Sequence, residues 1–221
     1  MNAWKSIKRR LRRKIVRDHL ESFMASNRTE ETVLELGCGQ SKYSKYFPNR
    51  IAVDIVKRGG VDIVADSHHL PFISSRFSTV MTTEMLEHVH DPQRVVNEIE
   101  RVLQPGGRLI LTTRFLYPIH EAPFDYYRFT KYGLAHLFRN WSDVDIRADT
   151  SPFEGIGVMF QVMTYQSDFH GSKLIAGLCL MTAQILRFFD RLIIRQYGNY
   201  NRSVAETQII TSGYYVVAYR T

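Results

Sequence analysis

The chain has 221 residues and a mass of 25.8 kDa, enough for one domain with a sizeable core and too little for two large ones. With 44% hydrophobic and 23% charged residues, its composition excludes a disordered or fibrous protein. The net charge of +7 comes entirely from the first twenty residues, which hold eight basic side chains and one acid, so the remaining chain is neutral. Cys38 and Cys179 form no disulfide framework and no CxxC pair, which is typical of a reducing compartment.

The N-terminal segment is predicted to be a basic amphipathic helix over residues 1–28, followed by one main domain over residues 29–221. Its apolar stripe is Trp4, Ile7, Leu11 and Ile15, and its cations are Lys5, Lys8, Arg9, Arg10, Arg12, Arg13, Lys14 and Arg17. This helix could lie on an anionic membrane, attract nucleic acid, or dock on the domain. Because the rest of the chain is neutral and shows no RNA-binding module, residues 1–20 favour a membrane surface over nucleic acid. No signal peptide is evident, so we expect a cytoplasmic protein, peripheral at the inner membrane face.

Short β-branched runs alternate with helical segments and glycine turns between residues 32 and 113. Strands are expected over residues 32–36, 51–55, 61–66, 77–82 and 108–113. Asp91 and Pro92 begin a helix as its N-cap and first residue, and Pro105 with the two glycines after it ends that helix. This alternation predicts an α/β domain with a mainly parallel sheet.

The pattern is looser beyond residue 113. The expected elements are a helix over 131–139 capped by Thr130, a strand over 144–148, a long helical stretch from Ser172 to near Gly198, and a last strand over 214–219. Residues 174–194 are more apolar than one buried helix face requires. Packing on the sheet, a dimer contact and lipid contact remain open for this stretch, and the sequence favours packing on the sheet.

A glycine turn, Gly37-Cys38-Gly39, follows the first expected strand. It is not the dinucleotide fingerprint GxGxxG, because Lys42 stands at the third glycine position. Glu35, two residues before the turn, would repel a pyrophosphate and suits a ligand that carries an ammonium group. Asp54 at the end of the second strand can accept from both hydroxyls of a ribose, and Asp66 lies where it could meet an adenine amino group.

Five segments in register, VLELGCG, AVDI, ADSHHLPF, EMLEHVHDP and VLQPGGRLILTT, resemble the class I S-adenosylmethionine-dependent methyltransferases, in the broad group with LPF and LEHV signatures. The resemblance covers residues 32–113. It implies a Rossmann-like, doubly wound, mainly parallel seven-stranded sheet with an antiparallel last strand, and S-adenosyl-L-methionine as cofactor. The cofactor contacts that it implies are Glu35, Gly37, Cys38, Gly39, Asp54, Ile55, Asp66, Ser67 and Glu84. Ser41 stands where the family often has a third glycine, and its small size should be tolerated.

The segment over residues 120–130 resembles an H-x-x-P-x-D-Y-x-R stretch found after the fifth strand in a subset of bacterial methyltransferases. His120 offers a base, and Asp125 a carboxylate that could orient it. We predict His120, Asp125 and His88 as catalytic residues, and Tyr126, Arg128 and Arg114 as substrate-binding residues. An internal Asp125–Arg128 ion pair that holds a lid remains an equal alternative.

Glu84, Glu87 and His88 are similar to the E-x-x-E-H segment of ubiquinone-biosynthesis O-methyltransferases, where these side chains are associated with a divalent metal. The LEHV segment also occurs widely in this methyltransferase group without metal. The sequence therefore favours a site without metal.

Together these patterns predict a methyltransferase that acts on an oxygen of a small-molecule, saccharide or lipid-linked acceptor. An RNA methyltransferase that uses the basic arm and a non-catalytic cofactor-binding interaction protein are the alternatives. The oligomeric state and the identity of the acceptor are not encoded in any motif.

Overall fold

The computed structural model describes residues 14–40, 43–170 and 172–221, which form two compact units. The larger unit comprises residues 22–114, 119–147 and 214–221, and the smaller one includes residues 14–21, 115–118 and 148–213. Residues 1–13 of the predicted basic helix, as well as Ser41 and Lys42, lie outside the described residues. The described part of the arm forms α2 (Ile15–Ser26).

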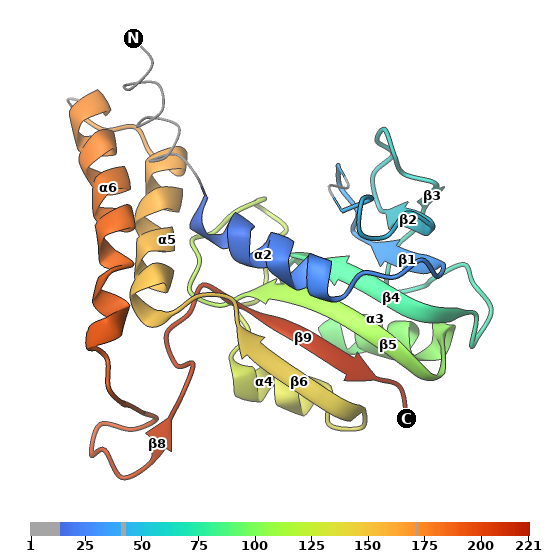
Figure 1. Cartoon of the computed structure of the whole chain (residues 1–221). Coiled ribbons are helices and arrows are strands. Elements are labelled where there is room, and N and C mark those ends of the chain that lie inside the picture. The colour runs from blue at the N-terminus through green and yellow to red at the C-terminus, as the bar shows by residue number, and fades with distance from the viewer. Residues whose placement is uncertain (1–13, 41–42, 171) are drawn as a thin grey trace. The chain divides into compact units, whose positions relative to one another are not determined.

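The larger unit is built on a seven-stranded sheet in the order β3-β2-β1-β4-β5-β9-β6, mostly parallel with β9 antiparallel (Figure 1). Its strands are β1 (Val33–Leu36), β2 (Arg50–Asp54), β3 (Ile63–Val64), β4 (Phe77–Thr83), β5 (Leu103–Arg114), β6 (Ser142–Ala148) and β9 (Gly213–Tyr219). This confirms the predicted fold class. Because β1 pairs in parallel with both β2 and β4, and β4 with β5, the carboxyl ends of these four strands meet at one edge of the sheet.

Two predicted helices of this unit are confirmed together with their caps. In α3 (Pro92–Val102) the Asp91 carboxylate accepts from the Arg94 backbone N–H at 3.1 Å, and the helix buries Val95 and Ile99. In α4 (Lys131–Leu137) the Thr130 hydroxyl accepts from the Gly133 N–H at 3.0 Å. A short 3-10 turn, η1 (Leu86–His88), follows β4.

Two element boundaries differ from the prediction. The helix α3 ends at Val102 and not at the Pro-Gly-Gly turn, because Leu103 already pairs with Phe77 of β4 before a register shift in that strand. The third strand, β3, is only Ile63–Val64. These two residues pair with Val53 and Asp54, and β2 ends at Asp54, so β3 has no partner beyond that residue.

The smaller unit contains two helices, α5 (Pro152–Gln166) and α6 (Ser172–Leu186), which lie side by side (Figure 1). Gly157 allows this close packing, since a Cβ there would lie 2.8 Å from the Ala183 carbonyl oxygen. The helix α5 was not predicted. The helix α6 was predicted to reach Gly198 but ends at Leu186, and the 3-10 turn η2 (Phe189–Leu192) and the two-stranded ribbon of β7 (Gln196–Tyr197) and β8 (Ala205–Glu206) follow it.

The core of this unit joins α2, α5 and α6 through Ile15, Val158, Val162 and Ala183. Among the described residues, no helix has both the length and the hydropathy needed to cross a bilayer.

Candidate functional site at the carboxyl edge of the sheet

The turn after β1 is held open by its two glycines and by Asp54. Gly37 and Gly39 have positive φ angles of 64° and 53°. The Asp54 carboxylate accepts from the Gly39 N–H at 2.9 Å and, through its other oxygen, from the Val56 N–H at 2.9 Å. Each of these oxygens retains a second acceptor position, so Asp54 can hold the turn and still bind ribose hydroxyls.

Glu35 and Cys38 flank this turn and are both buried. The Glu35 carboxylate accepts from Arg50 Nε at 2.6 Å, an ion pair that the sequence analysis missed although Arg50 begins β2, the neighbour of β1. Burial, followed by the charges of Glu35 and Asp54, raises the pKa of the Cys38 thiol to about 11. Cys38 is therefore a protonated packing residue at neutral pH and not a nucleophile.

The predicted adenine-side residues lie in the loop after β3. Asp66 Oδ1 accepts from the His68 backbone N–H at 2.9 Å and from His68 Nδ1 at 2.6 Å. Burial acts to raise the pKa of Asp66, but these two hydrogen bonds outweigh it, so the pKa is lowered and Asp66 stays ionised. Ser67 is buried with its hydroxyl 3.6 Å from Met85 Sδ, and Ile55 is exposed.

Glu84 and Arg114, predicted for cofactor and substrate respectively, form an ion pair with each other. Glu84 directly follows β4 and has a φ of 52°, a left-handed conformation that is rare for residues other than glycine. Arg114 ends β5 and is buried. Such backbone strain at a strand end is typical of functional sites.

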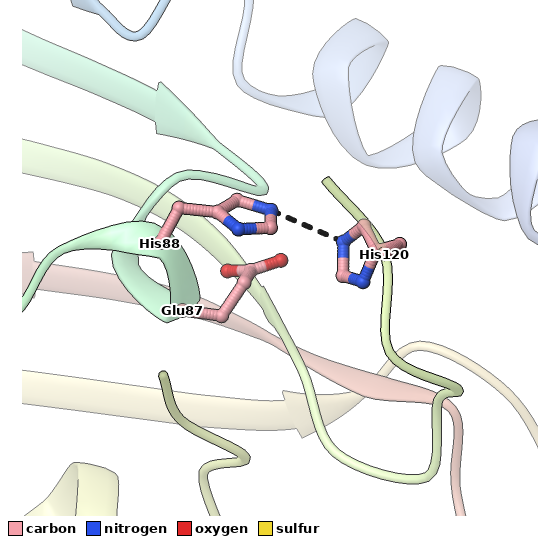
Figure 2. A group of neighbouring side chains, drawn as sticks. All are labelled: Glu87, His88 and His120. Carbon is pink, nitrogen blue, oxygen red and sulfur yellow. Dashed lines mark hydrogen bonds between the residues drawn. The ribbon is translucent and has the colours of Figure 1, made fainter. Parts of the chain in front are cut away.

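The predicted catalytic residues lie in one cluster between η1 and the segment after β5. His88 Nε2 lies 3.1 Å from His120 Nε2 (Figure 2). The Asp125 carboxylate accepts from the His120 backbone N–H at 2.9 Å and from Arg128 through two contacts of 2.6 Å. The Arg128 guanidinium is the main reason why the pKa of Asp125 is lowered to about 2. The internal Asp125–Arg128 ion pair, which the sequence left open as an alternative, is therefore present in the same cluster as the two histidines.

The Nδ1 atom of each imidazole contacts an oxygen atom, and these contacts determine which ring nitrogens carry protons. His88 Nδ1 lies 2.7 Å from the Phe124 carbonyl oxygen, an arrangement that places its proton on Nδ1. His120 Nδ1 lies 3.5 Å from the Asp125 carboxylate, which likewise favours a proton on Nδ1. The 3.1 Å contact between the two Nε2 atoms is then a hydrogen bond only if a proton lies between them, so this position suits a proton or another cation.

Glu87 lies beside the two histidine rings in the same cluster (Figure 2). It is fully buried, and its Oε2 accepts from the Thr113 hydroxyl at 2.8 Å, whereas its Oε1 has no hydrogen-bond partner among the described residues. Burial raises the pKa of Glu87. Ligand atoms of Glu87, His88 and His120 all lie within 4.8 Å of one another, so these residues could hold a transition-metal ion. Glu84, which the sequence pattern grouped with Glu87 and His88, pairs instead with Arg114.

The segment after β5 is attached to η1 through its backbone. The Tyr126 and Tyr127 N–H groups both donate to the Glu87 carbonyl oxygen, at 2.9 and 3.1 Å, while their rings are exposed. The Tyr126 ring is therefore available to a substrate. No signal in the sequence indicated that Glu87 would bind this segment through its backbone.

Comparison with known proteins agrees with this geometry. Residues 34–111 match the family described as "Methyltransferase domain". This match lies within residues 32–113, the region whose motifs resemble the class I S-adenosylmethionine-dependent methyltransferases. The matched region contains most of β1 and all of β2, β3, β4 and α3, and with them the glycine turn, Asp54 and the Glu87–His88 turn.

Curated relatives match this chain over part of their length. It is 32% identical over 132 residues to the demethylmenaquinone methyltransferase of Thermobifida fusca, covering 51% of this chain and 56% of the relative. It is 34% identical over 86 residues to an uncharacterized protein of Methanocaldococcus jannaschii, covering 35% and 42%. The chain thus spans about half the length of the curated relatives that it matches.

Solved structures share the fold of this chain over most of its length. A possible histamine N-methyltransferase from Thermotoga maritima matches with a TM-score of 0.57 and 13% identity, covering 94% of this chain and 92% of that one. The [4+2]-cyclase SpnF matches with a TM-score of 0.53 and 16% identity, covering 92% and 81%. The [4+2]-cyclase SpnF thus shares this fold, so the reaction must be argued from the site.

Proposed function

We propose that this chain binds S-adenosylmethionine at the carboxyl edge of β1, β2 and β4 and transfers its methyl group to a hydroxyl oxygen of a small-molecule, saccharide or lipid-linked acceptor. The observation that carries the proposal is the position of the His88–His120–Asp125 cluster. This cluster lies beyond the carboxyl ends of β4 and β5. The glycine turn after β1 and Asp54 at the end of β2 lie at the same edge of the sheet.

The cofactor half of the proposal is supported by the family match and by the turn. The Gly39 backbone N–H lies against the Asp54 carboxylate, and the space beside Gly39 is open, since a Cβ there would meet nothing within 4 Å. Several solved structures with this fold contain the cofactor or its product, among them a 1,6-didemethyltoxoflavin-N1-methyltransferase of Burkholderia thailandensis with bound S-adenosylhomocysteine. A buried Glu35 beneath the turn suits the ammonium group of the methionine moiety.

The acceptor half rests on the imidazole pair. In the transfer, the hydroxyl oxygen attacks the sulfonium methyl in line, the sulfur keeps the bonding electrons, and S-adenosylhomocysteine leaves. The hydroxyl proton is taken up between His88 Nε2 and His120 Nε2, where the two lone pairs converge. Asp125 and the Phe124 carbonyl keep both rings in the required tautomer. Arg128 and Tyr126 lie on the same segment and are the proposed substrate contacts.

Cofactor binding is tested first by titrating S-adenosylhomocysteine into the full chain in a calorimeter. We expect micromolar binding that Asp54→Ala weakens at least about tenfold, the equivalent of 1.4 kcal/mol for the lost ribose hydrogen bonds. The matched control is Asp145→Ala, which removes an exposed carboxylate paired with Arg147. Equal affinities of the Asp54 variant and the wild type would refute the assigned cofactor site.

The acceptor is tested with a radiolabelled methyl donor and three cell fractions: water-soluble small molecules, lipids and tRNA. The tRNA fraction is included because a relative 26% identical over 103 residues is a tRNA (carboxymethyluridine(34)-5-O)-methyltransferase of Schizosaccharomyces pombe, matched over 41% of this chain and 45% of the relative. We expect label in one of the first two fractions. Label in tRNA alone would overturn the proposed acceptor class, and tight cofactor binding without any label would favour a non-catalytic role.

The imidazole pair is tested separately on the labelled acceptor. His88→Asn and His120→Asn should each slow methyl transfer about 10²- to 10⁴-fold while S-adenosylhomocysteine affinity stays within about twofold. His136→Asn, on the exposed face of α4, is the control. Unchanged rates in both cluster variants would show that no base is needed.

A further inference from the structure

The helix α6 presents an apolar stripe that no other described element covers. Its members recur at alternating spacings of four and three residues and so share one face of the helix. They are Leu174, Leu178, Met181 and Ile185 of α6, and Phe188, just after the helix, and Leu192 of η2 continue the spacing. The opposite face of α6 holds Leu180 and Ala183, both buried. Packing of this stretch on the sheet stays a prediction.

The stripe is most exposed at its two ends, and Leu174 at its start is 72% exposed. Phe188 and Leu192 are 76% and 69% exposed, and Ile194 is 99% exposed. Contiguous exposed apolar side chains of this size mark an interaction surface on a protein. The helix α6 has only 15 residues, so it is too short to span a bilayer and can only lie along a surface.

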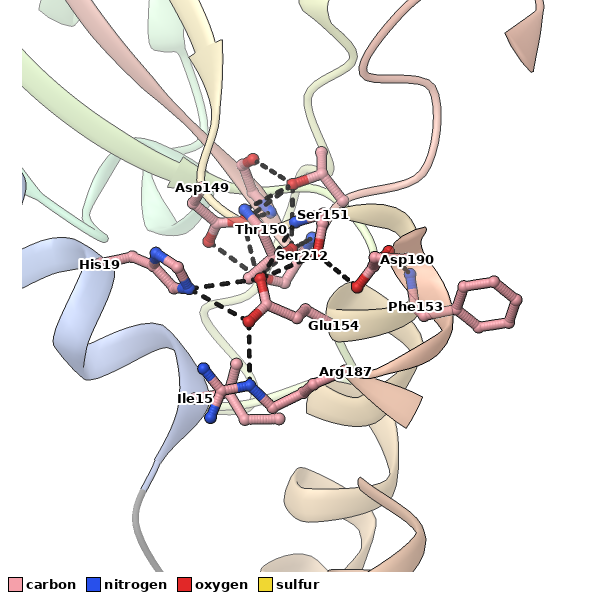
Figure 3. A network of polar contacts seen from close by, with 12 residues as sticks. Ile15, His19, Asp149, Thr150, Ser151, Phe153, Glu154, Arg187, Asp190 and Ser212 are labelled. Carbon is pink, nitrogen blue, oxygen red and sulfur yellow. Dashed lines mark hydrogen bonds and ion pairs between the residues drawn. The ribbon is translucent and has the colours of Figure 1, made fainter. Parts of the chain in front are cut away.

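The charges around the stripe indicate which surface it fits. Next to its C-terminal end, Arg191 and Arg195 are exposed, whereas the neighbouring Asp190 is half-buried. The Asp190 carboxylate accepts from the Ser151 hydroxyl at 2.6 Å and from the Phe153 N–H at 2.8 Å (Figure 3).

Other acids of the smaller unit are also turned inward. Glu154 is buried and accepts from Arg187 Nε at 2.9 Å, and Asp149 is buried against Ser212 (Figure 3). Elsewhere on this unit Lys14 and Arg17 are exposed cations, with Lys14 Nζ 6.0 Å from the Tyr165 ring centroid, and Asp168, in the loop before α6, is an exposed acid. The surface of this unit at the end of the stripe therefore combines apolar and cationic side chains.

We infer that this stripe, together with the exposed Ile194, is a docking surface for a bilayer that contains anionic phospholipids. Apolar side chains would enter the interface while Arg191 and Arg195 contact headgroup phosphates, the arrangement of an interfacial amphipathic helix. A second copy of the chain is a poorer occupant, because pairing two such surfaces brings like charges together. The inference does not depend on the proposed function, although it would place the protein where lipid-linked acceptors are found.

The test is flotation of the full chain with vesicles of phosphatidylcholine alone or mixed with phosphatidylglycerol. We expect flotation with the mixed vesicles and at least about tenfold weaker partitioning for the triple variant Leu178→Ser, Ile185→Ser, Phe188→Ser. Arg191→Gln and Arg195→Gln should each weaken it about fivefold on the mixed vesicles. Ile73→Ser, at an equally exposed apolar residue of the larger unit, should float like the wild type.

Two further measurements make the result decisive. Far-UV circular dichroism and S-adenosylhomocysteine titration show whether the triple variant remains folded, and the substituted residues lie outside the cofactor site. A variant that neutralises Arg9, Arg10, Arg12 and Arg13 reports on the N-terminal arm. No flotation of the wild type, or flotation that only the arm variant abolishes, would overturn the inference. Sedimentation that reveals a dimer dissociated by the triple substitution, without vesicle binding, would do the same.

Discussion

Gly37 and Gly39 both have left-handed backbone conformations, but the space around them differs. A Cβ on Gly37 would lie 2.7 Å from Met85 Cγ, whereas a Cβ on Gly39 would meet nothing within 4 Å. We expect Gly39→Ala to cost about 1–2 kcal/mol through backbone strain alone. Gly37→Ala should cost about 2–4 kcal/mol because overpacking adds to the strain. Denaturant unfolding of both variants measures this difference, and equal losses would show that Met85 moves away freely.

Asp125 is expected to control the acid stability of the site segment. Its pKa is lowered to about 2 by Arg128, so its contribution to stability is complete above the ordinary Asp pKa of about 3.9 and is lost as the pH falls through about 2. Asp125→Asn should cost about 2–4 kcal/mol at neutral pH. This is less than for a fully buried pair, because 25% of the Arg128 side chain is exposed.

The same substitution should flatten the dependence of unfolding free energy on pH between about 4 and 2. The control is Asp145→Asn, whose ion pair with Arg147 is exposed and should contribute at most about 1 kcal/mol. A wild type and an Asp125 variant with the same acid dependence would contradict the assignment.

The individual residues of the site were more predictable than their partners. His88, His120 and Asp125 were recognised from the residue types that follow two strands, and parallel pairing brings such residues together. The Arg50–Glu35 pair and the Thr113–Glu87 hydrogen bond were not, because each depends on side-chain direction within the sheet. Sequence periodicity reports the face of a strand but not which neighbour a long side chain reaches.

At the scale of elements, the helices of the smaller unit show where the sequence reading failed. The α5 helix begins with Ser151-Pro152-Phe153-Glu154, a capping-box pattern with proline at the first helical position. The Glu154 carboxylate accepts from the Ser151 hydroxyl at 2.8 Å. This signal was present and could have predicted α5. The end of α6 at Leu186 had no comparable signal, since Gly198 was the first glycine after it.

The contact between α2 and α5 should depend on pH in the opposite direction to Asp125. Hydrogen bonding to Glu154 raises the pKa of His19, with Nε2 3.3 Å from the carboxylate (Figure 3). A raised pKa in the folded state means that this stabilisation is complete below the ordinary His pKa of about 6.5 and is lost as the pH rises through the raised value. His19→Gln should therefore reduce the unfolding free energy more at pH 6 than at pH 9.

The corresponding control for His19 is His136→Gln, at an exposed residue of α4. It should change the unfolding free energy equally at both pH values. A His19 variant with a pH-independent loss would mean that the interaction with Glu154 involves only the neutral imidazole.

At the scale of the whole molecule, the two compact units share continuous elements. The helix α2 passes from the smaller unit to the larger one after Glu21, and β9 continues directly from residue 213. The larger unit is itself assembled from three separate stretches of chain, and its last strand lies between β5 and β6. Unfolding the smaller unit would thus break α2 and release the start of β9. We therefore expect that neither unit unfolds alone.

We therefore predict one calorimetric unfolding transition, which S-adenosylhomocysteine shifts as a whole. At about 100 times its dissociation constant the ligand should add about 2.7 kcal/mol, which corresponds to roughly 5–10 °C in Tm for a chain of this size. Asp54→Ala should reduce the shift in proportion to its lost affinity, and Asp145→Ala should leave it unchanged. Two transitions, with the ligand moving only one, would show that the units unfold independently despite α2 and β9. A single transition that the ligand does not move would instead count against cofactor binding, so the two ideas fail in different ways.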